Sequence, residues 1–192
     1  MHLYRDKILA VGVHGIILSS KDMGLTWTQA ENVPFTNTLT DVQCVTESQC
    51  WAVGHDLTIL HSVDGGKNWS IQFEDKDFDA PFLSIHMIDY LNGIVVGAFA
   101  QSLTTSNGGE NWSSTVVTDD AYEPHLNSVY SSNIMKSEIG NDLMFVAGEI
   151  GQVHISNDQG ESWNMVDTEY FGSLWGGISV DQKRKLLLGM AG

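Results

Sequence analysis

The sequence predicts an all-β fold, a β-propeller of four-stranded antiparallel blades, and three repeated features of its 192 residues support this prediction. An eight-residue phrase, S-x-D-x-G-x-T-W, recurs four times. Each copy follows a glycine at a constant distance, and an apolar residue stands further upstream. Self-similarity at a period of about 40 to 50 residues is typical of propellers and large solenoids. About four and a half units are present, and their spacing sets the fold class.

The eight-residue phrase, here called the box, predicts a tight hairpin. Its copies span residues 20–27, 62–69, 105–112 and 156–163, which places the closing tryptophans 42, 43 and 51 residues apart. The acid is expected to accept hydrogen bonds from the turn, and the glycine supplies a positive φ. The tryptophan is expected to pack against the next blade. These structural positions are Asp22, Trp27, Asp64, Trp69, Asn107, Trp112, Asp158 and Trp163.

The boxes are not expected to be metal sites. Each offers a single carboxylate or amide, far fewer than the about six to eight oxygen ligands that calcium takes. Asn107 replaces the acid in the third copy, so that hairpin is expected to persist in a weaker form. The sequence therefore predicts no metal and no cofactor.

The spacing upstream of each box predicts the remaining strands. Glycines at positions 12, 54, 97 and 148 end a strand, always 15 residues before the box tryptophan. The first strand of a unit begins at an apolar anchor: Leu39, Phe82, Leu126, and either Leu174 or Trp175. Seven extra residues within 131–141 indicate a longer hairpin tip. One domain over residues 1–192 is expected, with repeats near 1–30, 31–73, 74–116 and 117–167, and a partial repeat 168–192.

The units do not add up to a whole number. The chain opens in the second strand of a unit, at Lys7 to Gly12, and residues 188–192 match the second strand of a fifth unit. Three interpretations stay open. The strand near Leu174 lies beside the strand near Ile8 and closes a small ring, two chains complete each other, or the chain is part of a longer propeller. Because unpaired strand edges associate readily, a homodimer or a fragment is favoured over a closed monomer.

Composition excludes several classes of partner. The chain has 24 acidic and 9 basic residues, a formal charge of −15. Nucleic acids and anionic lipids are bound through Lys and Arg that neutralise phosphate, so neither is expected as a partner. Membrane insertion is not expected either, because no apolar run approaches the roughly 20 residues that a spanning helix needs.

The box resembles the Asp-box, or BNR repeat, of sialidase-like propellers. The phrases Trp51-Ala52-Val53-Gly54 and Asp64-Gly65-Gly66-Lys67-Asn68-Trp69 narrow the resemblance to the photosystem II stability/assembly factor-like repeat family. This resemblance implies a propeller, commonly seven-bladed in that family, that serves as a protein-binding assembly platform. The leading prediction is accordingly a non-catalytic scaffold that contacts a protein partner, and the alternative is a carbohydrate-binding or glycoside-hydrolysing propeller.

An enzymatic role finds little support in the residues. Sialidases with Asp-boxes bind the substrate carboxylate with three arginines, and this chain has only Arg5 and Arg184. Lysine is a poor substitute in bidentate recognition of a carboxylate. The xyloglucan hydrolases with such boxes need two carboxylates across a cleft, and no pair stands out among the 24 acids. No catalytic residue is therefore assigned.

The two cysteines bracket a predicted hairpin. A three-residue tip, Thr46 to Ser48, places Cys44 opposite Cys50, and directly opposed residues in an antiparallel pair come within bridging range. A disulfide is favoured over two buried free thiols. The same Cys-x5-Cys-Trp-Ala-Val-Gly phrase is also known from secreted bacterial members of the resembling family. A disulfide implies an oxidising, extracytoplasmic compartment, either periplasmic or secreted.

The binding face is expected on the side opposite the boxes, where the loops between units meet the turns between the second and third strands. We call this side the loop face. Its loops between units carry all three prolines and ten of the 24 acids. An aromatic residue stands four positions before each anchor and is interpreted either as a packing residue under the loop or as an exposed anchor for a basic peptide, a protein patch or a sugar. The candidate residues are Phe35, His55, Asp56, Phe78, Phe99, Tyr122, Glu149 and Tyr170.

Overall fold

The computed structural model describes residues 1–131, 143–179 and 184–190, and its strands form five antiparallel sheets. The first two sheets contain β1 (His2–Tyr4), β2 (Lys7–Val11), β3 (Ile17–Ser20) and β4 (Thr28–Gln29), then β5 (Leu39–Cys44), β6 (Cys50–Gly54), β7 (Thr58–Ser62) and β8 (Ser70–Phe73). The next two contain β9 (Phe82–Met87), β10 (Gly93–Gly97), β11 (Ser102–Thr105) and β12 (Ser113–Ser114), then β13 (Leu126–Ser131), β14 (Met144–Gly148), β15 (Gln152–Ser156) and β16 (Asn164–Asp167). The last pairs β17 (Ser173–Ser179) with β18 (Lys185–Met190), and a short 3-10 turn, η1, covers Val13–Gly15.

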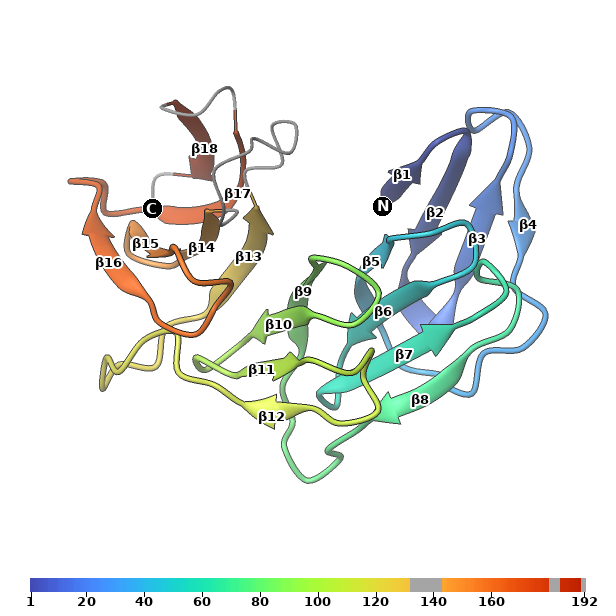
Figure 1. The fold of residues 1–192 in the computed structure, drawn as a ribbon, viewed down its shortest axis with the longest axis horizontal. Helices are drawn as coiled ribbons and strands as arrows, with labels where there is room; N and C mark the ends of the chain where they lie inside the picture. The colour runs from blue at the N-terminus through green and yellow to red at the C-terminus, as the bar shows by residue number, and fades with distance from the viewer. Residues whose placement is uncertain (132–142, 180–183, 191–192) are drawn as a thin grey trace.

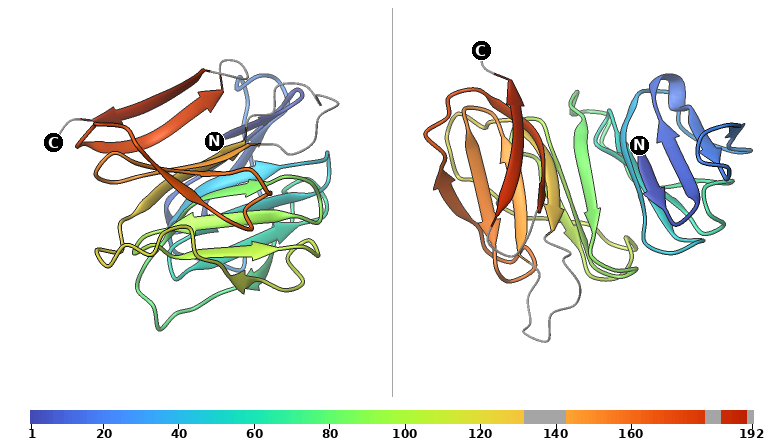
Figure 2. Two further views of the ribbon diagram at one scale, coloured as in Figure 1. Left: turned by 60° about the vertical axis from the view of Figure 1, so that its left-hand side comes forward. Right: turned by 90° about the horizontal axis from the view of Figure 1, so that it is seen from above.

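The sheets are the blades of a β-propeller, so the predicted fold class is confirmed. Figure 1 shows them in an open arc, with β1, β5, β9, β13 and β17 on its inner side, and Figure 2 shows neighbouring sheets standing face to face. The expectation that the first unit lacks its first strand is wrong. Residues 2–4 form β1, which pairs with β2 through Leu3 and Ile8. This strand is only three residues long, which is too short for a periodic pattern to predict it.

The hydrophobic core lies between blades. Strands β6, β10 and β14 are buried at every residue, and four apolar clusters fill the spaces between consecutive sheets. The box tryptophans join these clusters, but Trp69, Trp112 and Trp163 pack toward the preceding blade, which corrects the expected direction. Trp27, in the first blade, is 40% exposed.

The pairing of each apolar anchor with a glycine explains why a glycine recurs at the end of the second strand of each unit. Leu39 pairs with Gly54, and Phe82 with Gly97, each beside an irregularity in the register. A Cβ on Gly54 would lie 2.3 Å from the carbonyl oxygen of Thr38, so no other residue fits without moving the backbone. In the last unit Gly189 pairs with Leu174, which is buried, whereas Trp175 is exposed. Leu174 is therefore the anchor of that unit.

The second Asp-box shows how the hairpin is held. Asp64 Oδ1 accepts hydrogen bonds from Asn68 N at 3.0 Å and from Ser62 Oγ at 2.9 Å, while Oδ2 accepts one from Asn68 Nδ2 at 2.8 Å. The backbone N–H of Gly66 donates to Ser62 Oγ at 2.7 Å, and Trp69 Nε1 donates to the Gly66 carbonyl at 3.0 Å. The acid thus fixes the turn and the tryptophan closes it.

The third Asp-box keeps only part of this network, as expected. Asn107 Oδ1 still accepts hydrogen bonds from Asn111 N and Thr105 Oγ1, both at 3.0 Å. Trp112 Nε1, however, is buried and finds no hydrogen-bond acceptor among the described residues. An unpaired buried N–H is costly, so this hairpin is the weakest of the four.

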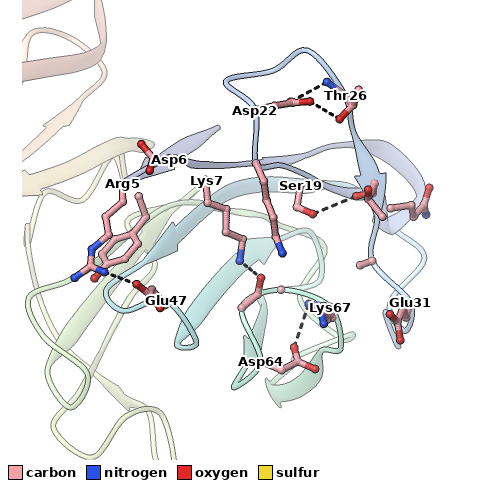
Figure 3. A pocket seen from close by; sticks show the side chains of 17 residues that line it. Arg5, Asp6, Lys7, Ser19, Asp22, Thr26, Glu31, Glu47, Asp64 and Lys67 are labelled. Carbon is pink, nitrogen blue, oxygen red and sulfur yellow. Dashed lines mark hydrogen bonds and ion pairs between the residues drawn. The ribbon is translucent and has the colours of Figure 1, made fainter.

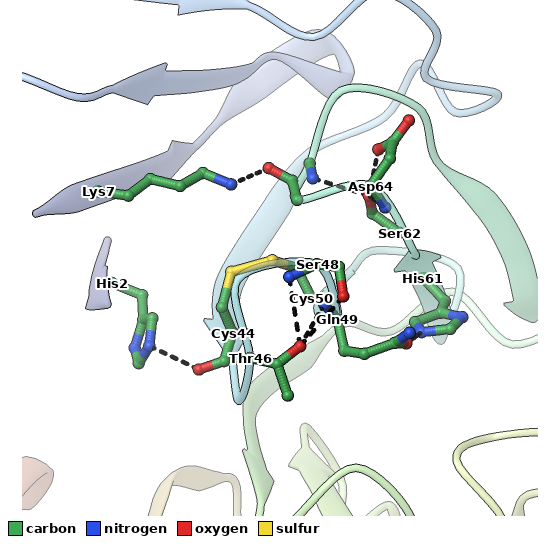
Figure 4. The surroundings of a disulfide bond; sticks show 12 residues. His2, Lys7, Cys44, Thr46, Ser48, Gln49, Cys50, His61, Ser62 and Asp64 are labelled. Carbon is green, nitrogen blue, oxygen red and sulfur yellow. Dashed lines mark hydrogen bonds between the residues drawn. A yellow bond between two sulfur atoms is a disulfide. The ribbon is translucent and has the colours of Figure 1, made fainter. Parts of the chain in front are cut away.

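The disulfide between Cys44 and Cys50 is present and crosses the β5–β6 hairpin (Figure 4). The two residues are directly paired in the register, with Cα atoms 4.0 Å apart, as the three-residue tip predicts. Next to them, Gln49 N donates to Thr46 Oγ1 at 2.9 Å and His2 Nε2 lies 3.1 Å from the Cys44 carbonyl oxygen. The first blade is thereby joined to the disulfide hairpin of the second.

The remaining expectations concern the chain ends and the long hairpin. The strand near Ile8 pairs with β1 and β3, and the strand near Leu174 pairs with β18, so these two strands do not lie beside each other as the small closed ring requires. The long hairpin tip expected within residues 131–141 lies outside the described residues beyond Ser131. Across the described ranges, no helix is long and apolar enough to cross a membrane.

The Asp-boxes predict that the blades are sensitive to acid. Hydrogen bonds from Thr26 and from Ser162 lower the pKa of Asp22 and of Asp158 to about 2, and for Asp64 the hydrogen bonds from Asn68 overcome burial with the same result. A pKa lowered in the folded state means that stability is present above the ordinary value of 3.8 and is lost as the pH falls toward 2.

We expect the melting temperature to fall between pH 4 and pH 2, followed by circular dichroism, and to fall less in the double variant Asp22→Asn/Asp158→Asn. Asn107→Asp is the matched opposite change and steepens the fall, because it adds a carboxylate to an equivalent turn. An identical pH profile in the wild type and the double variant contradicts the assignment.

Candidate functional site

The loop face is built on four turns of the same shape. Each joins the second and third strands of a blade and carries two successive residues with positive φ, as in a type I′ turn. In the third blade these residues are Phe99 and Ala100, with φ of 54° and 55°, and Gln101 N donates to the Ala98 carbonyl at 3.1 Å. The corresponding pairs in the other blades are His14 and Gly15, Asp56 and Leu57, and Ile150 and Gly151.

Each turn is held by the loop that enters the next blade. The N–H of Ala100 donates to the Pro124 carbonyl at 3.0 Å, two residues before the anchor Leu126. The turns of the other three blades make the same bond to the residue two before the next anchor, and the pairs are Gly15 with Asn37, Leu57 with Ala80, and Gly151 with Gly172. The turns and the loops between units therefore form one continuous frame.

An aromatic cluster lies on this frame between the second and fourth blades. The rings of Phe78 and Phe99 meet edge to face with centroids 6.3 Å apart, and Phe99 meets the ring of His125 in the same way at 5.0 Å. Phe78 is 37% exposed and Phe99 44% exposed. We call Phe78, Phe99 and His125 the aromatic cluster.

The backbone at Phe99 is strained for such a residue. Positive φ at a bulky non-glycine residue costs about 1–3 kcal/mol, and such residues gather at functional sites. The strained turn holds the Phe99 ring out toward solvent and against its two neighbours.

A carboxylate borders the aromatic cluster. Glu149 Oε2 accepts a hydrogen bond from His125 N at 3.1 Å, and Glu149 Oε1 lies 4.0 Å from His125 Nδ1. Farther along, Asp120 Oδ1 accepts from Tyr122 N at 3.0 Å and Oδ2 accepts from Gln152 Nε2 at 2.8 Å. The first of these bonds, helped by the second, lowers the pKa of Asp120. Glu149 is thus fixed in position beside the aromatic cluster, and Asp120 is fixed by Tyr122 and Gln152.

The other candidate residues differ in burial and do not belong to the aromatic cluster. Phe35 is 6% exposed and belongs to the core between the first two blades, so it is a packing residue. Tyr122, four residues before its anchor like Phe35, is 65% exposed. Tyr170 is partly buried against the last apolar cluster. Asp56 is half-buried and accepts a hydrogen bond from Asn37 Nδ2 at 3.3 Å, beside His55, whose N–H donates to the Thr38 carbonyl.

The sequence did not single out His125, although it contacts both Phe99 and Glu149. Its only signal is its place between Pro124 and the anchor Leu126, where a loop enters a blade. The assembled site presents an exposed aromatic surface bordered by the fixed carboxylate of Glu149. Such a surface can bury an apolar side chain against the rings and pair a cation with Glu149.

Two phenylalanines at equivalent positions give a direct test of these assignments. Phe35→Ala is expected to lower the free energy of unfolding by about 3–5 kcal/mol, because it empties a packed core. Phe78→Ala is expected to lower the free energy of unfolding by only about 1 kcal/mol, because it mainly removes an edge-to-face contact. Urea denaturation of both variants measures the difference. Equal losses in the two variants contradict the division between a core ring and a surface ring.

Comparisons with known proteins agree with this architecture. The sequence pattern of the photosynthesis system II assembly factor YCF48 family matches residues 25–174. The chain is 27% identical, over 137 residues, to the photosystem II assembly lipoprotein Ycf48 of Synechococcus sp. (strain CC9902); the match covers 70% of the chain and 38% of that relative. The chain thus spans less than half the length of this curated relative.

Two solved structures share the fold. A structure of YCF48 bound to D1 peptide has a TM-score of 0.60 at 20% identity, over 91% of this chain and 48% of that one. The GH74 xyloglucanase from Xanthomonas campestris has a TM-score of 0.65 at 13% identity, over 97% of this chain and 27% of that one. At such identities the likeness is one of fold. The family match, which covers most of the chain, goes further: this chain belongs to the photosynthesis system II assembly factor YCF48 family.

Proposed function

We propose that this chain is a non-catalytic scaffold that binds a segment of a protein partner on its loop face. The observation that carries the proposal is the exposed aromatic cluster with Glu149 at its border. Exposed rings in contact with one another, on a rigid backbone frame, are the usual anchors of protein interfaces. The matching family is one of assembly factors, and one YCF48 structure holds a D1 peptide, which supports a protein partner.

The chemistry of the face suggests what the partner segment carries. An apolar or aromatic side chain is expected against Phe99 and Phe78, where it removes both rings from water. A Lys or Arg is expected near Glu149 and His125. The overall charge of −15 favours the approach of a basic segment by long-range attraction.

The disulfide supports an oxidising compartment for this chain, since such bonds persist outside the reducing cytosol. The curated relative is named a lipoprotein, which agrees with an extracytoplasmic site of action. We therefore infer a periplasmic, lumenal or secreted location for the binding activity.

The carbohydrate-binding or glycoside-hydrolysing alternative stays a prediction. The likeness to GH74 enzymes is one of fold alone, at 13% identity. Because propellers host many unrelated functions, this likeness does not carry hydrolysis to the present chain.

The loop-face proposal is tested by titrating the D1 peptide, and the same peptide with its Lys and Arg replaced by Gln, into the protein by calorimetry. Phe99→Ala is expected to weaken binding about tenfold or more, as loss of an interface anchor does. Glu149→Gln is expected to weaken binding of the original peptide more than that of the peptide without Lys and Arg. Leu25→Ala, an exposed change on the Asp-box side, is the control and should leave binding unchanged.

Two results contradict the proposal. One is an affinity that is the same for Phe99→Ala as for Leu25→Ala. The other is the absence of saturable binding for the wild type with either peptide.

We also propose that two copies of the chain associate through the last sheet. On β18, Leu186, Leu188 and Met190 alternate on the side away from Leu187, which packs on the fourth blade, and all three are exposed. Ile178, opposite Leu186, extends this apolar surface onto β17. Exposed apolar surface of this kind favours association, particularly on a sheet in which β18 pairs with β17 alone among the described strands.

Light scattering after size exclusion is expected to give twice the chain mass of 21.1 kDa. The double variant Leu186→Ser/Leu188→Ser is expected to elute with the mass of one chain, while Leu25→Ala keeps the mass of the wild type. A wild type that elutes as a single chain at all concentrations overturns the homodimer.

A further inference from the structure

A second candidate site lies on the opposite side of the propeller from the loop face. A cleft of about 830 Å³ opens between the Asp-box hairpins of the first and second blades (Figure 3). One wall is the β1–β2 hairpin with Arg5 and Lys7, together with Lys21 from the first Asp-box. The other wall is the second Asp-box with Gly65 and Lys67. The volume lies within the range typical of small-ligand sites, about 300–1,000 Å³.

Basic residues concentrate in this cleft. Arg5, Lys7, Lys21 and Lys67 are four of the nine Lys and Arg residues of the chain, although acids outnumber bases overall. Arg5 is paired with Glu47 at the rim. The Lys7 ammonium donates to the carbonyl of Gly65 (Figure 3). Lys21 and Lys67 form no ion pair with any carboxylate in the described part of the chain.

Five carboxylates line the same cleft as these cations, and three of them are already held by partners. Asp22 and Asp64 are committed to their own hairpins, where they accept hydrogen bonds from residues such as Thr26 and Asn68. Asp6 and Glu31 are the remaining carboxylates of the lining besides Glu47. Burial lowers the pKa of Lys7, and the neighbouring positive charges of Lys21 and Lys67 lower it further, while the negative charge of Asp64 acts in the opposite sense.

Equivalent places in the other blades show that blade packing does not require these cations. Between the second and third Asp-boxes the neutral amide of Gln72 donates to the Gly108 carbonyl at 2.9 Å. Gly108 occupies the same box position as Gly65, the acceptor for Lys7. Between the third and fourth boxes a cleft of about 320 Å³ is lined by residues such as Asn92, Asn107 and Asp158, and none of the described residues that line it is Lys or Arg.

We propose that the cleft between the first two Asp-boxes binds an oxyanion group, a phosphate or a carboxylate, of a small ligand. Lys21 and Lys67 hold the anion from opposite walls, and Lys7 supplies a third ammonium from the wall that also carries Lys21. Hydrogen bonds between ammonium groups and oxyanions are short and roughly twice as strong as neutral ones. The site is separate from the aromatic cluster, so it adds a second ligand to the proposed scaffold.

The test titrates sodium phosphate, sodium acetate and sodium citrate into labelled protein at about 0.01 M salt, where charge interactions are least screened. Amide chemical shifts of Asp6, Gly65 and Lys67 report binding, and a sodium chloride titration of equal ionic strength is subtracted. Saturable shifts are expected with phosphate, or with acetate and citrate. The kind of anion that binds with the higher affinity shows whether the natural ligand carries a phosphate or a carboxylate.

Three variants decide the role of the lysines. Lys21→Gln/Lys67→Gln is expected to weaken binding by about tenfold or more, since it removes two charge-assisted hydrogen bonds to the anion. Lys7→Gln keeps an amide donor for the Gly65 carbonyl, as Gln72 does for Gly108, and is also expected to weaken binding. Lys76→Gln, which removes a lysine paired with Glu74 in another loop, should leave binding unchanged.

The proposal is overturned if none of the anions gives saturable shifts beyond those of chloride, or if the double variant binds as the wild type does. Its failure is distinguishable from failure of the protein-binding proposal, because Phe99→Ala leaves the lysines in place and the lysine variants leave the aromatic cluster in place.

Discussion

The whole structure depends on burying one strand of each of the three middle blades on both of its faces. Strands β6, β10 and β14 have no exposed residue, because a neighbouring blade covers each side. A sheet with two apolar faces is stable only in a stack, which is why the blades cannot be independent units. The same requirement explains the fixed spacing of 15 residues from the glycine to the tryptophan, since any insertion there shifts a buried strand.

Hydrogen bonds between the inner strands of neighbouring blades align the blades within this apolar packing. Asp41 on β5 accepts hydrogen bonds from Ser84 Oγ and Ile85 N on β9, both at 3.1 Å. Burial raises the pKa of Asp41, although these bonds act in the opposite sense. Ser84 Oγ in turn accepts a hydrogen bond from Val129 N on β13 at 3.3 Å. Each inner strand is therefore tied to the next, and a buried polar seam of this kind specifies how the blades are aligned.

The sequence predicted the features that depend on local spacing along the chain. It missed the features that depend on contacts between neighbouring blades. The hairpins, the anchor-to-glycine pairs and the disulfide register all follow from short-range distances along the chain, and each is present. The direction of Trp69 depends instead on how two sheets stack. Phe35 and Phe78 have the same spacing from their anchors but opposite burial, since the loops that carry them differ. Contacts such as Phe99 with His125 join separate blades and leave no periodic signal.

The loop face shows how one frame can carry different chemistry. Its four turns share two positive φ values and the same bond to the next loop, yet the residue at the tip is His14, Asp56, Phe99 or Ile150. A Cβ on Gly15 or Gly151 would strike the backbone of the next loop, whereas Leu57 and Ala100 fill that position in the other two blades. The backbone shape is thus held by hydrogen bonds rather than by glycine alone. A tip residue can then change without changing the fold, and function can be altered at the face while the core stays intact.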